Sequence, residues 1–133
     1  MIFVDTGAWF ATFVPNDPDH VAAIGWFDRN SEPLVTTDYV VDELLTLLKI
    51  RREYGRAIRV GEDLLDDKMA QLEWVLPIDV RMAWLTFSQF RDKGWSFTDC
   101  VSKAVMERLN IQTAFAFDEH FRQFGSVSVA PSP

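Results

Sequence analysis

Two short apolar runs end directly on a carboxylate, and they restrict the fold of this chain more than any other feature. Residues 1–4 lead into Asp5, and the largely apolar residues 111–117 lead into Asp118. A short run without alternation is typical of a strand that is buried on both faces, and such strands belong to parallel sheets. Ligands bind open α/β sheets at the carboxyl ends of the strands. If the two strands are parallel neighbours, Asp5 and Asp118 meet at one edge of the sheet.

Strands and helices are predicted to alternate along the chain. β-Prone segments at 34–37, 72–78 and 127–129 predict further strands. Apolar residues at helical spacing, together with capping signals, predict the helices between the strands. These helices cover residues 6–14, 20–30, 39–54, 56–68, 80–92 and 98–109, with a helical turn at 119–124. The alternation predicts an α/β fold with a mainly parallel sheet of four to five strands.

Three helix boundaries depend on particular side chains. We expect Thr37 or Asp38 to cap the third predicted helix, because either side chain accepts a backbone hydrogen bond. Gly55 is expected to end or kink that same helix. Asp79 is expected to be the N-cap of the fifth.

Composition and charge narrow the class of protein. The 133 residues are 48% hydrophobic and 14% aromatic, which predicts a single globular domain, residues 1–133, rather than a disordered chain. No apolar stretch approaches the roughly 18 residues of a membrane span, and the N-terminus lacks the basic region of a signal peptide. The single cysteine, Cys100, fits a reducing compartment, so we expect a cytoplasmic protein.

The chain is acidic, with a net charge of −7. This counts against a protein that coats nucleic acid, because phosphate binding depends largely on Lys and Arg. Two explanations of the acidity remain open, namely metal-binding carboxylates in a nucleic-acid enzyme and a basic protein partner.

Four carboxylates are candidates for one site. Besides Asp5 and Asp118, Asp99 lies in the first turn of a predicted helix, and Glu43 lies early in another. Clustered carboxylates repel one another unless a cation neutralises them, and all-oxygen ligation selects Mg²⁺ or Mn²⁺. One or two such ions can activate water for the in-line hydrolysis of a phosphodiester. The supporting hydroxyls near this site would come from Thr6, Ser96 and Thr98. Taken singly, each acid also has an ordinary explanation as a helix or turn cap.

Four motifs, in their order along the chain, resemble those of PIN-domain nucleases. They are Ile2-Phe3-Val4-Asp5-Thr6, Tyr39-Val40-Val41-Asp42-Glu43-Leu44, Ser96-Phe97-Thr98-Asp99-Cys100 and Ala114-Phe115-Ala116-Phe117-Asp118-Glu119-His120-Phe121. The resemblance covers the whole chain at the usual length of the family. One motif alone would mean little, but four in register make the assignment strong.

The resemblance implies a three-layer α/β/α sandwich and a Mg²⁺- or Mn²⁺-dependent enzyme that cuts RNA. Asp5, Glu43, Asp99 and Asp118 match the acidic ligands of the family, and Thr6 or Thr98 matches its supporting hydroxyl. Within the family, a small chain of this kind is most similar to VapC-type toxins of toxin–antitoxin pairs. That similarity implies a homodimer and inhibition by a small antitoxin protein.

Two of the matched acids have an acidic neighbour. Glu119 follows Asp118, and either residue is a candidate for the fourth acid, with Asp118 favoured by register. Asp42 precedes Glu43, and helix geometry lets only one of the two face inward. The family pattern is also broken at Gly7, where many members carry Asn or Ser.

Other residues have both a functional and a structural interpretation. His120 is expected to be structural, with a role on RNA as the alternative. A basic cluster is a candidate for holding RNA phosphates, or is simply a solvated helix end; its members are Lys49, Arg51, Arg52, Arg56 and Arg59. Two other functions compete with the nuclease. One is a non-catalytic module that binds RNA or protein, and the other is a phosphoaspartate enzyme, which Gly7 disfavours because that pattern requires a second Asp there.

Overall fold

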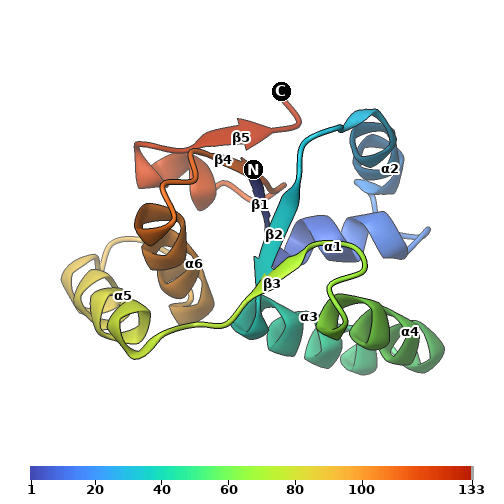
Figure 1. Cartoon of the computed structure of the whole chain (residues 1–133), viewed down its shortest axis with the longest axis horizontal. Helices are drawn as coiled ribbons and strands as arrows, with labels where there is room; N and C mark the ends of the chain where they lie inside the picture. Colours follow the sequence, from blue (N-terminus) through green and yellow to red (C-terminus); the bar gives the residue numbers. More distant parts are fainter. Residues whose placement is uncertain (133) are drawn as a thin grey trace.

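A five-stranded parallel sheet lies at the centre of the computed structural model, which describes residues 1–132 (Figure 1). The strands are β1 (Ile2–Val4), β2 (Leu34–Thr37), β3 (Gln71–Glu73), β4 (Thr113–Phe115) and β5 (Ser128–Ala130). Their order is β3-β2-β1-β4-β5, and every neighbouring pair is parallel. Pro133, the last residue of the predicted domain, lies outside the described residues.

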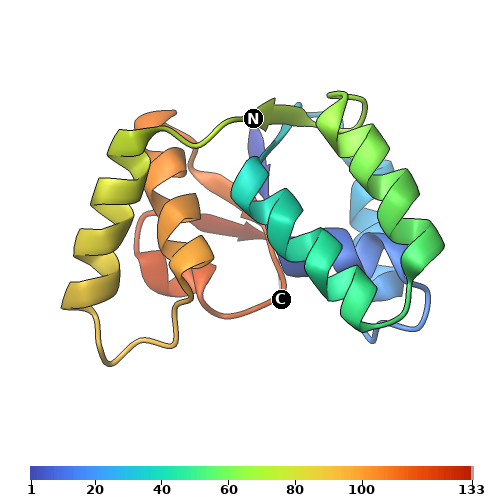
Figure 2. The same cartoon turned by 90° about the horizontal axis from the view of Figure 1, so that it is seen from below.

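Six α-helices within residues 1–132 cover the sheet. They are α1 (Thr6–Phe13), α2 (His20–Arg29), α3 (Asp38–Ile50), α4 (Tyr54–Leu65), α5 (Pro77–Gln89) and α6 (Phe97–Arg108), with a short 3₁₀ helix, η1 (Phe121–Phe124), after β4. Figures 1 and 2 show α1–α4 on one side of the sheet and α5 and α6 on the other. The predicted α/β/α sandwich is therefore confirmed. In the described part of the chain, no helix is both long and apolar enough to cross a membrane.

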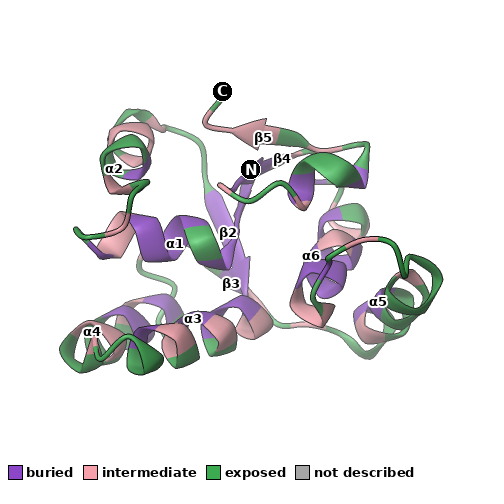
Figure 3. Cartoon of the chain, turned by 180° about the vertical axis from the view of Figure 1, so that it is seen from behind, coloured by how far each residue is buried: buried purple, intermediate pink, exposed green. Residues whose placement is uncertain are grey.

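The core lies between the sheet and the inward faces of the helices, as the burial colouring in Figure 3 shows. β1 is buried at all of its residues, as expected for a central strand of a parallel sheet. Phe3, Trp9 and Phe115 are among the largest fully buried side chains. These residues belong to β1, α1 and β4, so large buried side chains surround the strand that leads to Asp5.

Two consecutive buried hydrogen bonds connect β1, β2 and α1. The Trp9 indole Nε1 donates a hydrogen bond to Thr36 Oγ1 over 3.2 Å, and Thr36 Oγ1 donates to the Val4 carbonyl over 3.3 Å. Trp9 and Thr36 are both fully buried. A buried polar group without a hydrogen-bond partner destabilises the folded state. These two hydrogen bonds therefore fix the end of β1, one residue before Asp5.

The third predicted helix is shorter than expected. We expected a helix over 39–54 that ends or kinks at Gly55, but α3 ends at Ile50 and Gly55 lies inside α4. Arg52 adopts the left-handed conformation, with φ 62°. Glu53 N donates to Leu48 O, and Arg52 N donates to Lys49 O. This pair of bonds is the Schellman motif, which usually places glycine at the left-handed position. At the start of α3, Thr37 rather than Asp38 is the cap, since Val40 N donates to Thr37 Oγ1.

The structure around β3 and α5 also differs from the prediction. The strand expected at 72–78 covers only Gln71–Glu73, because Pro77 begins α5. Leu76 is the N-cap of α5, so the prediction that Asp79 is the N-cap was wrong. The buried Asp79 carboxylate instead accepts a hydrogen bond from Leu76 N and pairs with both Nε and a terminal nitrogen of Arg108. It therefore ties the start of α5 to the end of α6.

We predict that Thr36→Val lowers the free energy of unfolding by about 1–3 kcal/mol. Valine has nearly the shape of threonine but leaves the buried Trp9 Nε1 without its acceptor. Thr36→Ser is the control, because it keeps the hydroxyl and loses only a methyl group, a change of about 0.8 kcal/mol. Urea unfolding measures both variants. A Thr36→Val variant as stable as the wild type would show that the hydrogen bonds of Thr36 do not hold this end of β1.

Candidate active site

Two of the predicted acids meet at the carboxyl edge of the sheet. Asp5 follows β1 and is the N-cap residue of α1, and Asp118 comes three residues after the end of β4. β1 and β4 are parallel neighbours, with Val4 paired to Phe115. Asp5 N donates to the Phe115 carbonyl over 3.0 Å, which extends the pairing by one residue. The strand order therefore brings these two carboxylates to the same place.

Asp99 reaches the same edge from α6. Ser96 is the N-cap of this helix, and its hydroxyl accepts a hydrogen bond from Asp99 N over 3.0 Å. In return, Asp99 Oδ2 accepts from Ser96 N, also over 3.0 Å. This capping box fixes Asp99 in the first turn, where the positive end of the helix dipole favours its charge. Asp99 therefore takes part in the capping box of α6 and also belongs to the site.

A cavity of about 340 Å³ lies where these elements meet. Its lining includes all four predicted acids, Asp5, Glu43, Asp99 and Asp118. The remaining lining residues are Thr6, Gly7, Leu47, Ser96 and His120. Asp5 and Asp99 are only 3% and 5% exposed, whereas the Asp118 side chain is 47% exposed. The acids therefore run from the floor of the cavity to its rim.

The structure distinguishes the acids from their acidic neighbours. Asp42 and Glu119 are exposed, and neither lines the cavity that holds Glu43 and Asp118. The hydroxyls also differ. Thr6 and Ser96 line the cavity, whereas Thr98, which is half-buried, does not.

The electrostatics of the cavity are unfavourable for ionised acids. Burial raises the pKa of Asp5 well above its ordinary value, and the nearby charges of Asp118, Asp99 and Glu43 raise it further, against a hydrogen bond from the Thr6 backbone. Burial also raises the pKa of Asp99, and Asp118 adds to the rise. The Ser96 backbone N–H and His120 oppose this rise. A cation in the cavity would relieve both the burial cost and the mutual repulsion.

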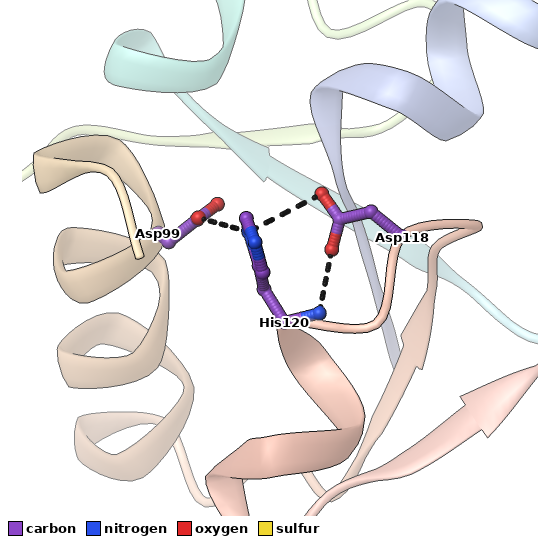
Figure 4. Close-up of side chains that lie close together, drawn as sticks. All are labelled: Asp99, Asp118 and His120. Carbon is purple, nitrogen blue, oxygen red and sulfur yellow. Dashed lines mark hydrogen bonds and ion pairs between the residues drawn. The ribbon is translucent and has the colours of Figure 1, made fainter. Parts of the chain in front are cut away.

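His120 lies between two of the acids (Figure 4). Its Nδ1 is 2.7 Å from Asp99 Oδ2 and 3.6 Å from Asp118 Oδ2, and its backbone N–H donates to Asp118 Oδ1 over 2.9 Å. From the sequence we expected a structural role for His120 and did not place it in the site. The signal that could have placed it there was the Asp-x-His spacing, which puts the imidazole on the same loop as Asp118.

The donor set fits a hard divalent cation. Asp99, Asp118 and His120 each offer a ligand atom, and these atoms lie within 4.8 Å of one another. Carboxylate oxygens are the preferred ligands of Mg²⁺ and Mn²⁺, whereas imidazole more often binds softer ions such as Zn²⁺, and His120 here is the 2.7 Å partner of Asp99. The Thr6 hydroxyl, which is buried at the cavity wall, has no hydrogen-bond partner among the described residues. A polar atom buried in this way leaves a position for an additional polar ligand.

The predicted basic cluster is dispersed rather than gathered at the cavity. Arg56 pairs with Glu53 over 2.9 Å and donates to the Phe13 carbonyl over 3.0 Å. Lys49 lines an apolar groove between α3 and α4, and Arg59 lines a small cavity beside α1. Arg51 differs from these residues, because its guanidinium lies over the Phe10 ring of α1.

Comparisons with known proteins agree with this geometry. Residues 2–127 match the PIN domain family. The chain is 32% identical over 131 residues to the 23S rRNA-specific endonuclease VapC20 of Mycobacterium tuberculosis, covering 98% of this chain and 99% of that protein. It is 27% identical to ribonuclease VapC26 of the same organism, over 90% of this chain and 89% of that protein.

Solved structures show the same relationship. The crystal structure of M. tuberculosis VapC20, described as a sarcin-ricin loop cleaving toxin, superposes with a TM-score of 0.88 at 31% identity. It covers 96% of this chain and 97% of that one. FitAcB from Neisseria gonorrhoeae, at 14% identity and a TM-score of 0.65 over 97% and 96% of the two chains, shares the fold. The chain therefore belongs to the PIN domain family, and its likeness within that family is to the VapC ribonucleases.

Proposed function

We propose that this chain is a Mg²⁺- or Mn²⁺-dependent endoribonuclease and the toxin of a toxin–antitoxin pair. The observation that carries the proposal is the single cavity that four carboxylates share at the carboxyl edge of the sheet. Its support from comparison is the full-length similarity to an rRNA-specific endonuclease. All four acids are present, which counts against a non-catalytic binding module.

The cavity residues have separate roles in the proposed nuclease. Asp5, Asp99 and Asp118, with Glu43, would hold the metal, which supplies positive charge to activate water and to stabilise the reacting phosphoryl group. The backbone bond from Asp5 N to the Phe115 carbonyl holds Asp5, the capping box of α6 holds Asp99, and His120 fixes the orientation of Asp99 through its 2.7 Å contact. The buried Thr6 hydroxyl would hydrogen-bond a ligand in the cavity.

RNA, a small antitoxin protein and a second copy of the chain are the proposed partners. RNA is the substrate, by analogy with the rRNA-specific relative. A small antitoxin that places a basic side chain among the acids would relieve the same repulsion as a metal. We further propose a homodimer of single-domain chains that acts in the cytoplasm, where its RNA substrate would be found.

Asp5→Asn and Asp99→Asn are each expected to lower RNA cleavage by at least about 100-fold, because losing even an outer-shell partner of a metal ligand costs 10–100-fold. The assay follows cleavage of a labelled RNA in Mn²⁺ and in chelator. Circular dichroism checks that both variants fold. Cleavage that survives both substitutions, or that continues unchanged in chelator, would leave the nuclease proposal without its chemistry and favour a non-catalytic module.

Two matched pairs of variants test which acids belong to the site. Glu43→Gln and Asp118→Asn are expected to lower cleavage at least about 10-fold, because both residues line the cavity. Asp42→Asn and Glu119→Gln remove the same charge from exposed neighbours and should stay within about twofold of the wild type. The same RNA assay measures all four variants. A larger loss in Glu119→Gln than in Asp118→Asn would reverse the assignment of the fourth acid.

Asp5→Asn is also expected to make the metal-free protein more stable at neutral pH. The pKa of Asp5 is raised in the folded state, so the ionised carboxylate costs stability, and this cost appears as pH rises from about 4 through the raised pKa. Each pKa unit corresponds to about 1.4 kcal/mol. Thermal unfolding in chelator at several pH values measures the difference, which should be small at acidic pH and grow toward neutrality. A pH-independent difference would contradict this account.

A further inference from the structure

One line of residues on α3 runs from the acidic cavity to a single cation. Glu43, Leu47 and Arg51 follow one another at intervals of four residues, which places them along one face of the helix. Glu43 and Leu47 both line the cavity. Arg51 is the C-cap residue of α3, eight residues beyond Glu43, which corresponds to about 12 Å along the helix axis.

A second line on α1 leads to the same cation. Thr6 lines the cavity, and Phe10 lies one turn further along the same face of α1. The Arg51 guanidinium carbon is 5.7 Å from the centre of the Phe10 ring. α1 and α3 also pack against each other. The two helices therefore form one continuous surface from the carboxylates to Arg51.

Arg51 is the member of the basic cluster that is placed to bind a ligand on this surface. It is exposed and takes part in no ion pair among the described residues. Stacking on an aromatic face orients a guanidinium while leaving its N–H edge available for bidentate hydrogen bonds to a phosphate. Arg56, by contrast, already donates to Glu53 and to the Phe13 carbonyl.

We infer that Arg51 binds a backbone phosphate of the RNA substrate, separate from the phosphate that is cleaved, and that the RNA strand follows the surface between α1 and α3. This inference rests on the proposed nuclease function and adds a direction to it. Arg51 lies one helical turn beyond Leu47, the last α3 residue that lines the cavity, and does not line the cavity itself, so it is placed for a phosphate next to the one held among the acids. Its contribution is therefore to substrate binding rather than to the chemical step.

The matched control for Arg51 is Arg29, which carries the same charge at the opposite edge of the sheet. Arg29 is exposed and lies beside Ile2 and Thr113, the first residues of β1 and β4. Arg51→Gln and Arg29→Gln thus remove one positive charge each, with equal effects on net charge. Any difference in RNA binding between the two variants therefore depends on where the arginine lies and not on the net charge of the protein.

The first test measures binding of a single-stranded RNA oligonucleotide of mixed sequence to the full chain in Mn²⁺, with Asp5→Asn present in every protein to prevent cleavage. Fluorescence anisotropy at several salt concentrations gives the dependence of affinity on salt. Arg51→Gln is expected to weaken binding several-fold and to reduce the slope of log K against log salt by about 0.7, the value for one phosphate contact on a single strand. Arg29→Gln should leave the slope unchanged. Equal slopes for the two variants, or no RNA binding by the parent protein, would overturn the inference.

The second test measures steady-state cleavage without the Asp5 substitution. Arg51→Gln should raise KM and leave kcat near that of the wild type, because a contact made equally in the ground and transition states affects binding alone. Arg51→Lys should recover part of the affinity. If the wild type cleaves RNA and Arg51→Gln has the same KM, the phosphate subsite is refuted and the nuclease proposal stands. A wild type that binds RNA through Arg51 but cleaves nothing would refute the nuclease and leave the binding site standing.

Discussion

Burying carboxylates beside one another is the constraint on which the site depends. Asp5 lies almost completely out of contact with water, and burial alone raises its pKa before Asp118, Asp99 and Glu43 add their repulsion. Such an arrangement opposes folding unless other interactions offset it. The offsetting interactions within the chain are hydrogen bonds to the acids, namely the Thr6 backbone N–H to Asp5, and the Ser96 N–H and His120 to Asp99. They reduce this free-energy cost without removing it, and a cation bound among the acids would reduce it further.

The fold holds these acids together by using backbone that is already fixed for other reasons. Asp5 is attached to the central strand, whose last carbonyl accepts from Thr36 and whose neighbour on the other side is β4. Asp99 is held by the capping box of α6, and Asp118 by the loop that leaves β4. Asp5 directly follows a strand, and Asp99 lies in the first turn of a helix, so little flexible chain separates these two acids from the core. Repulsion between these buried carboxylates is therefore resisted by the packing of β1 and α6, whereas Asp118 depends on its own loop.

Sequence reasoning predicted the fold and assembled the candidate acids because both depend on local signals. An apolar run followed by Asp identifies a strand end, and parallel strands place their carboxyl ends at one edge. The contact of His120 with Asp99 joins residues that are 21 positions apart, so no local pattern determines it. The turn at Arg52 was missed because a left-handed residue that is not glycine carries no signal in composition. The strand at β3 was predicted but too long, because Trp74 and Val75 have strand propensity, while Pro77 starts a helix instead of continuing the strand.

The acidity of the chain and an RNA substrate are compatible because opposite charges occupy separate places. The net charge is −7, yet five of the 13 Lys and Arg residues lie between positions 49 and 59. Among the described residues, Arg51 forms no ion pair with a carboxylate of the cavity, and its guanidinium lies over the Phe10 ring instead, so its charge stays available to a phosphate. What governs an approaching RNA is then the local order of charge along this face of α3, with Arg51 beyond the end of the cavity and the acids within it, rather than the net charge of the whole surface.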